Sequence, residues 1–168
     1  AELCALYHFQ PELLDGAKFK SFQTQLDQRF AEWMLVNYSS LINHPPSPPA
    51  MLHHVPKQMA RELSQAAGHK VALVVIDGLA LDQWVTIRNE INLNLPFDES
   101  CVFAWVPTVT SVSRQVLFSA KAPLHFPNSI YTTSTEPKSW RNFWVEQGLQ
   151  ESEVYYEKSL GVDEIDFL

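Results

Sequence analysis

The sequence predicts an α/β fold with a mostly parallel sheet, preceded by a helical N-terminal segment. Two short apolar runs, at 70–76 and 100–106, have the aliphatic and β-branched composition of strands that are buried on both faces. A segment with helical spacing of apolar residues follows each run, and the β-α-β-α order is typical of a parallel sheet. The fold class therefore rests on these two runs and on the helices between them.

The composition limits the classes of function. The chain has 168 residues, 46% of them hydrophobic, and a net charge of −7, so one domain with a real core is expected and a nucleic-acid surface is not. No apolar run approaches the roughly 18 residues of a membrane span, and no basic-then-apolar leader is visible. Cys4 and Cys101 are isolated, which favours a reducing cytoplasm over a disulfide scaffold. We expect a cytoplasmic protein without a membrane or nucleic-acid partner.

The N-terminal part is predicted to be helical and to end at a proline-rich spacer. Aromatic and aliphatic residues recur at spacings of three and four from 17 to 43, which predicts one amphipathic helix that packs on a core or binds a partner. The segment 43–49 contains four prolines and cannot be helix or central strand. It is interpreted as a connector, with a polyproline ligand as the alternative. We therefore divide the chain into a helical segment, 1–44, a linker, 45–55, and an α/β domain, 56–168.

Helix start and stop signals and the spacing of apolar residues predict the elements of the α/β domain. The predicted elements are a helix at 56–67, a strand at 70–76, a helix at 80–93, a strand at 100–106, a helix from 110 to about 120, a loop at 121–134, a helix from 135 to 148, a short strand at 154–156 and an acidic tail.

Two polar residues follow the two predicted strands. Asp77 ends the run 70–76, and Thr110 comes shortly after the run 100–106. Ligands bind beyond the carboxyl ends of strands in an open parallel sheet, so these side chains are expected at the same edge. Asp77 is either a helix-capping residue or an oxygen ligand for a divalent metal. Thr110 is either a capping residue or, at a helix N-terminus that favours an anion, a hydroxyl that a metal could activate.

These residues match a known family. The element Val74–Gly78 together with Pro107-Thr108-Val109-Thr110, Ser119 and Pro123 resembles the alkaline phosphatase superfamily. With Asp82-Gln83-Trp84, residues 107–114 and Leu117-Phe118-Ser119, the chain looks like the PglZ domain of bacterial phage-defence and signalling proteins. The resemblance covers about residues 70–160. It implies a three-layer α/β/α fold that is truncated here, and a phosphatase or phosphodiesterase acting on a phosphate-ester substrate.

The resemblance also assigns roles to particular residues. Asp77 matches the first metal-ligand aspartate of the superfamily, and Thr110 matches the nucleophile that also binds metal. Ser113 aligns with a position that contacts a phosphate oxygen, and Arg114 is a further candidate for substrate binding or a surface residue of the helix. The family uses two divalent cations, typically zinc, which implies that Asp77 and Thr110 oxygens lie within about 4.4 Å of one another.

Completeness of the metal site separates two hypotheses. The resemblance places the remaining Asp and His ligands downstream, and nothing after Thr110 has that pattern, so we expect the zinc site to be incomplete within these residues. The first hypothesis is a fragment of a metal-dependent phosphohydrolase that is inactive alone. The alternative is a non-catalytic scaffold that binds protein partners of a defence or signalling complex. A truncated sheet would also expose an open edge, so a homo-oligomer is a further expectation.

Overall fold

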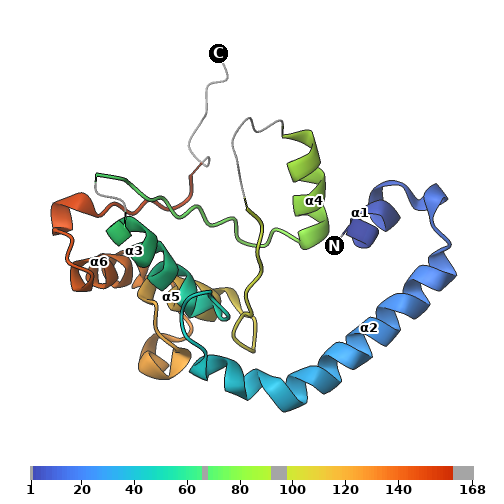
Figure 1. The fold of residues 1–168 in the computed structure, drawn as a ribbon, viewed down its shortest axis with the longest axis horizontal. Helices are drawn as coiled ribbons and strands as arrows, with labels where there is room; N and C mark the ends of the chain where they lie inside the picture. The colour runs from blue at the N-terminus through green and yellow to red at the C-terminus, as the bar shows by residue number, and fades with distance from the viewer. Residues whose placement is uncertain (1, 66–67, 92–97, 161–168) are drawn as a thin grey trace. The chain divides into compact units, whose positions relative to one another are not determined.

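The computed structural model describes residues 2–65, 68–91 and 98–160, and these residues are mainly helical (Figure 1). They divide into two compact units, unit 1 at 1–42 and 73–100 and unit 2 at 43–72 and 101–168. The α-helices are α1 (Glu2–Phe9), α2 (Gly16–Asn37), α3 (Val55–Gln65), α4 (Leu81–Glu90), α5 (Thr110–Ser119) and α6 (Glu136–Glu146). The 3₁₀ turns are η1 (Pro11–Leu13), η2 (Tyr38–Asn43), η3 (Leu52–His54), η4 (Pro123–His125), η5 (Pro127–Ser129) and η6 (Glu151–Glu153). The predicted domain boundaries at 44 and 55 stay a prediction.

The predicted three-layer α/β/α fold with a mostly parallel sheet is wrong. The described residues contain no sheet, and the strands expected at 70–76, 100–106 and 154–156 are absent. The β-pairing found there is one isolated parallel bridge between Met51 and Phe103. Its hydrogen bonds run from Leu52 N to Phe103 O and from Phe103 N to Ala50 O, each 2.9 Å long. The run 100–106 therefore pairs with 50–52 and not with 70–76.

The prediction failed because an apolar run specifies burial but not a hydrogen-bonding partner. In the segment 70–76 half-buried and exposed side chains alternate as they do in a strand, but Val74 is 73% exposed and Ile76 is 62% exposed. A strand needs a neighbour that accepts and donates its backbone hydrogen bonds. Without such a neighbour among the described residues, this segment is extended chain rather than a strand.

The helix predictions are confirmed, with ends that shift by a few residues. The long N-terminal helix is α2 followed by the 3₁₀ turn η2, and the predicted helices at 56–67, 80–93, 110–120 and 135–148 correspond to α3, α4, α5 and α6. The predicted ends at 66–67 and 92–93 and the acidic tail beyond 160 lie outside the described residues. None of the helices in the described ranges is long and apolar enough to cross a bilayer.

Unit 1 is organised by polar contacts around a small core. Ala5 of α1 and Val85 of α4 are buried, and Tyr7 stacks on Phe19 at a ring separation of 4.3 Å. Helix α2 begins after Asp15, whose carboxylate accepts hydrogen bonds from two backbone N–H groups of the first turn. No residue of α2 is buried, so this helix leaves its apolar stripe at the surface.

Unit 2 has the larger core, which α5 and α6 form together. Phe118 of α5 meets Trp140 of α6 edge to face at 5.7 Å, and Trp140 meets Trp144 in the same way at 5.4 Å. Such aromatic contacts add about 0.5–1.5 kcal/mol each beyond the area that they bury. Val116 of α5 is also fully buried. The core therefore fixes α5, the helix that carries Thr110, against α6.

Two adjacent histidines are buried next to the parallel bridge of unit 2. The indole N–H of Trp105 donates to Nδ1 of His53 at 3.3 Å, and the backbone N–H groups of Ala50 and Met51 approach Nδ1 of His54 at the same distance. Both rings are therefore acceptors at Nδ1 and are neutral. Burial, with smaller effects from His54 and Lys57, lowers the pKa of His53 to about 4.

The His53 environment makes unit 2 sensitive to acid. Between pH 6.5 and 4 the unfolded chain binds a proton at this histidine and the folded chain does not, so the free energy of unfolding falls as the pH falls through this window. His53→Asn keeps an acceptor for Trp105 but does not titrate. We expect a shallower decline of the unfolding free energy in this variant, measured by denaturant titration at several pH values. The exposed His125→Asn is the control, and equal slopes for His53→Asn and the wild type would contradict the assignment.

Candidate functional site

Thr110 is the first residue of α5, and its side chain is exposed. The N-cap is Val109, so Thr110 is not the capping residue that the sequence suggested as an alternative. The first intrahelical bond runs from Ser113 N to Val109 O, at 3.0 Å. The amides of residues 110–112 are thus the free N–H groups with which a helix starts, and they carry the positive end of its dipole. The Thr110 hydroxyl lies where an anion is favoured.

The neighbouring hydroxyl of Ser111 has a structural use. Its Oγ donates to the backbone carbonyl of Ile130 at 2.7 Å. Gln115, buried one turn later, donates to Ser129 O at 2.6 Å and accepts from Ser129 Oγ at 2.8 Å. These bonds fix the loop around η5 to α5. The first turn of α5 is therefore held in place by Ser111 and Gln115, whereas the described residues place no hydrogen bond on the Thr110 hydroxyl.

The C-terminus of α5 is also fixed. Ala120 is the C-cap residue and adopts a left-handed conformation with φ of 55°. Ser119 Oγ accepts a hydrogen bond from Lys121 N at 3.2 Å, which closes the turn after the helix. A left-handed residue is the common way to end a helix, and glycine usually occupies it. Ala120 takes this position here.

Asp77 lies in an exposed turn of unit 1, after the extended segment 70–76. Gly78 has a φ of 75°, a conformation that side chains with a Cβ rarely adopt, so the turn requires glycine there. The N-cap of α4 is Ala80, so Asp77 does not cap that helix. Asp77 belongs to unit 1 and Thr110 to unit 2, so their predicted approach to within a metal-bridging distance stays a prediction.

The donor types of these two residues suit a hard divalent cation, because a carboxylate and a hydroxyl both offer oxygen. A stable zinc site uses about three or four ligands. Within residues 2–65, 68–91 and 98–160 no cluster of three or more His, Cys, Asp or Glu residues could hold a metal. Asp77 and Thr110 therefore fit such a site in kind, and they do not by themselves complete it.

The other two predicted site residues follow Thr110 on α5. Ser113 is half-buried and lies one helical turn after Thr110, on the same face. The Arg114 side chain contacts α6: its Nε and Nη2 donate to the two carboxylate oxygens of Glu136, each at 2.7 Å. Its guanidinium also lies over the Phe118 ring, 5.7 Å from the centroid. Arg114 thus has a structural contact in addition to the substrate contact that the sequence suggested.

Glu136 and Tyr156 were missed by the sequence analysis. Glu136 is the first residue of α6 and is fully buried, and Tyr156 donates its hydroxyl hydrogen to the same carboxylate. Burial raises the pKa of Glu136, but the hydrogen bonds from Arg114 and Tyr156 outweigh it and leave the pKa below its usual value. Glu136 was visible in the sequence only as an acidic residue of a first turn. Its partners are about twenty residues away in each direction, so spacing gave no signal.

Removing the charge of Glu136 should destabilise unit 2 strongly. Glu136→Gln leaves the guanidinium of Arg114 largely buried without a counter-charge, which costs about 2–3 kcal/mol of unfolding free energy. Denaturant titration measures the loss. The matched control is Glu146→Gln, which breaks the exposed 3.5 Å pair with Lys121 and should cost less than about 1 kcal/mol. Equal losses for the two variants would show that the buried pair does not hold α5 to α6.

The chain was compared with known families, curated proteins and solved structures. No curated protein and no solved structure matched the chain. The family described as the BREX system PglZ alkaline phosphatase-like domain matches residues 55–166, a range that includes both Asp77 and Thr110. The match covers about two thirds of the sequence and confirms the resemblance found from the motifs. The chain belongs to the PglZ alkaline phosphatase-like domain family.

Proposed function

We propose that this chain is part of a metal-dependent phosphohydrolase in which Thr110 is the nucleophile. The observation that carries the proposal is the position of Thr110, exposed at the N-terminus of α5 with a hydroxyl that the fold does not use. Family membership supports it, because the alkaline phosphatase-like family is generally metal-dependent. The proposed ligand residues are Asp77 and Thr110, and the proposed metal is zinc. The proposed setting is a bacterial phage-defence or signalling system in the cytoplasm.

The proposed reaction uses Thr110 Oγ1 to attack the phosphorus of a phosphomonoester or phosphodiester. The bond to the leaving alcohol breaks as the new O–P bond forms, and the leaving oxygen takes up a proton. Water then hydrolyses the phosphothreonine and frees the hydroxyl. A divalent cation would lower the pKa of the hydroxyl and neutralise charge on the phosphoryl group. The free N–H groups at the start of α5 favour the phosphoryl oxygens, and Ser113 can donate one further hydrogen bond.

Arg114 has two roles in this proposal, which are positioning of α5 and contact with a substrate. Two of its nitrogens already donate to Glu136, so it holds α5 in position, and any contact with a substrate would use its remaining N–H groups. Its contribution to binding is thus expected to be smaller than that of Thr110. The proposal assigns Arg114 chiefly to positioning and keeps Ser113 as the nearer substrate contact.

Replacing the nucleophile should remove activity and leave the fold intact. We expect Thr110→Ala to reduce hydrolysis to background, because Ser111 donates to Ile130 O and Ser113 is half-buried, so neither can replace the Thr110 hydroxyl at the start of α5. Its unfolding free energy should change by less than about 0.5 kcal/mol, since Val109 and not Thr110 is the N-cap. The measurement is release of nitrophenolate from mono- and bis-nitrophenyl phosphate by the full-length protein with zinc added. Chelation of the metal should abolish the same activity.

Two further variants sharpen this test. Thr110→Ser retains a hydroxyl and should retain part of the turnover, whereas Thr108→Ala removes an exposed hydroxyl two residues away and should have wild-type turnover. Wild-type turnover in Thr110→Ala would refute the nucleophile assignment. So would an equal loss in Thr108→Ala, because that result would point to a general disturbance of the segment.

A second candidate function is non-catalytic docking within a multi-protein assembly. The specific observation that favours it is the surface of α2, a helix of 22 residues without a buried side chain. An amphipathic helix of this length gains little stability from propensity alone and is normally held by packing of its apolar face. Protein partners, or a second copy of the chain, are the proposed ways to cover it.

A further inference from the structure

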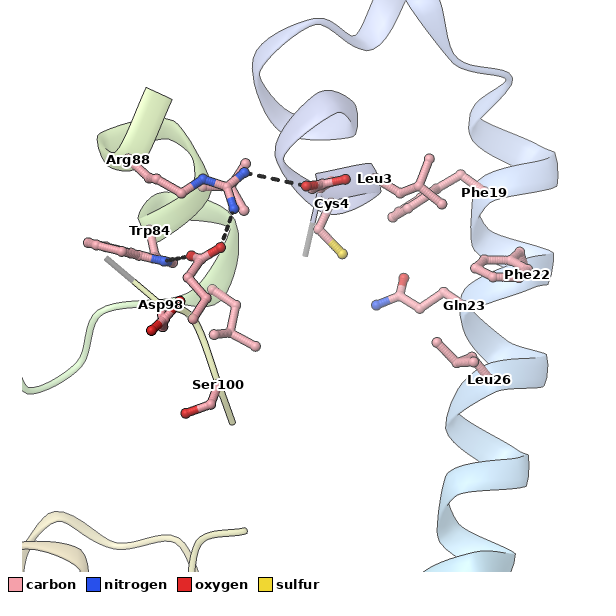
Figure 2. A pocket seen from close by; sticks show the side chains of 14 residues that line it. Leu3, Cys4, Phe19, Phe22, Gln23, Leu26, Trp84, Arg88, Asp98 and Ser100 are labelled. Atoms are coloured by element: carbon pink, nitrogen blue, oxygen red, sulfur yellow. Dashed lines mark hydrogen bonds and ion pairs between the residues drawn. The ribbon is translucent and has the colours of Figure 1, made fainter. Parts of the chain in front are cut away.

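A groove of about 780 Å³ lies in unit 1 among α1, α2, α4 and residues 98–100. Figure 2 shows side chains of α2 along one side of it and those of α4 and residues 98–100 along the other. Most of its lining is apolar, from Leu3 of α1, Phe19, Phe22 and Leu26 of α2, and Leu81 and Trp84 of α4. The groove belongs to unit 1 alone and does not involve Thr110.

The groove is open, which favours a macromolecular segment over a small ligand. Phe22 is 50% exposed, Leu26 is 55% exposed and Leu81 is 70% exposed, whereas a small-molecule site buries most of its ligand. Along α2 the stripe continues past the groove to Phe30, so apolar side chains follow one another about once per turn over roughly 12 Å. An apolar helix face laid along α2 matches this spacing.

The charges around the groove select the partner. Glu2, Asp98 and Glu99 contribute three carboxylates to its lining, and Arg88 is the basic residue among the lining residues. Arg88 already binds Glu99 at 2.6 Å and Glu2 at 3.3 Å, so the excess charge is negative. Residues 1–42 and 73–100 as a whole contain ten Asp and Glu residues against four Lys and Arg residues. A basic partner is therefore attracted and an acidic one is repelled.

The same charges disfavour a second copy of this chain as the occupant. The chain has a net charge of −7, and the exposed apolar stripe that it could offer lies on the acidic unit 1. Placing that stripe in the groove of another copy would bring like charges together, which costs affinity. We propose that the groove binds a basic amphipathic helix of a partner protein. This inference goes beyond the phosphohydrolase proposal and gives the docking function a partner of defined chemistry.

A pair of labelled peptides tests the inference. Both are helical and about 18 residues long, with leucine at helical spacing; one carries lysine on its polar face and the other carries glutamate in the same places. Fluorescence anisotropy with the intact protein measures their affinities. We expect the lysine peptide to bind, with a dissociation constant that rises with salt, and the glutamate peptide to bind at least tenfold more weakly.

Variants on one helix locate the binding surface. Leu26→Ser lies in the groove and should weaken binding of the lysine peptide about tenfold, whereas Leu35→Ser, 89% exposed on the same helix outside the groove, should bind as the wild type does. Circular dichroism checks that both variants are folded. Asp98→Lys changes only a charge at the groove and should also weaken binding several-fold, which keeps the test valid if Leu26→Ser misfolds.

Each result of these experiments either supports the inference or overturns it. Selective loss in Leu26→Ser and Asp98→Lys supports the inference, and Thr110→Ala should bind the lysine peptide as the wild type does, so failure of the hydrolase proposal would not affect this result. Equal binding of the two peptides, or equal binding by the Leu26→Ser and Leu35→Ser variants, would overturn it. Self-association of the wild type that Leu26→Ser abolishes would also overturn it, because a second copy would then be the occupant.

Discussion

The ion pair between Arg114 and Glu136 is the constraint on which unit 2 depends. A fully buried carboxylate is tolerated only when its oxygens are satisfied, and here Arg114 binds both oxygens while Tyr156 donates to one of them. The pair joins the middle of α5 to the first residue of α6. The aromatic contact between Phe118 and Trp140 joins the same two helices. Because the geometry of a bidentate pair is narrow, it fixes the rotation of α5 and hence the direction in which its first turn faces.

The helices could be predicted from the sequence and the sheet could not, and the reason is the range of the interactions. Apolar spacing and end signals such as Gly148, which has a φ of 97°, are local, so α2, α4, α5 and α6 were found nearly at their true bounds. Strand pairing is not local. The run 100–106 pairs with 50–52 through the Met51–Phe103 bridge, and no feature of either sequence segment identifies the other as its partner. The same limit applies to the site. Thr110 was placed at its helix start by local signals, whereas the Glu136 partner of Arg114 was not foreseen.

Unit 1 is held together by other interactions than unit 2. Its internal order comes from the acidic and aromatic groups around Arg88, with the Trp84 indole donating to Glu99 at 2.6 Å, rather than from a large core. The hydrogen bond from Trp84 and then that from Arg88 lower the pKa of Glu99, so its carboxylate stays charged. These contacts order α4, while Phe22 and Leu26 of α2 stay about half exposed. Unit 1 thus carries an excess of acidic groups together with exposed apolar side chains, and this combination is the basis of the proposed docking of a basic helix.

The hydroxyl groups at the start of α5 differ in their exposure and in whether the fold uses them. Ser111 donates to Ile130 O and is part of the fold, and Ser113 is half-buried one turn after Thr110. Thr110 alone of the three is exposed at the first helical position, where the dipole and the free N–H groups favour an anion. A residue that the fold does not need, placed where the backbone attracts phosphate, is available for reaction. The contacts of Ser111, Gln115 and Arg114 attach α5 firmly and so hold this hydroxyl in one place. The proposed role of Thr110 as a nucleophile requires such an attachment, because positioning contributes to catalysis only when the element that carries the nucleophile does not move.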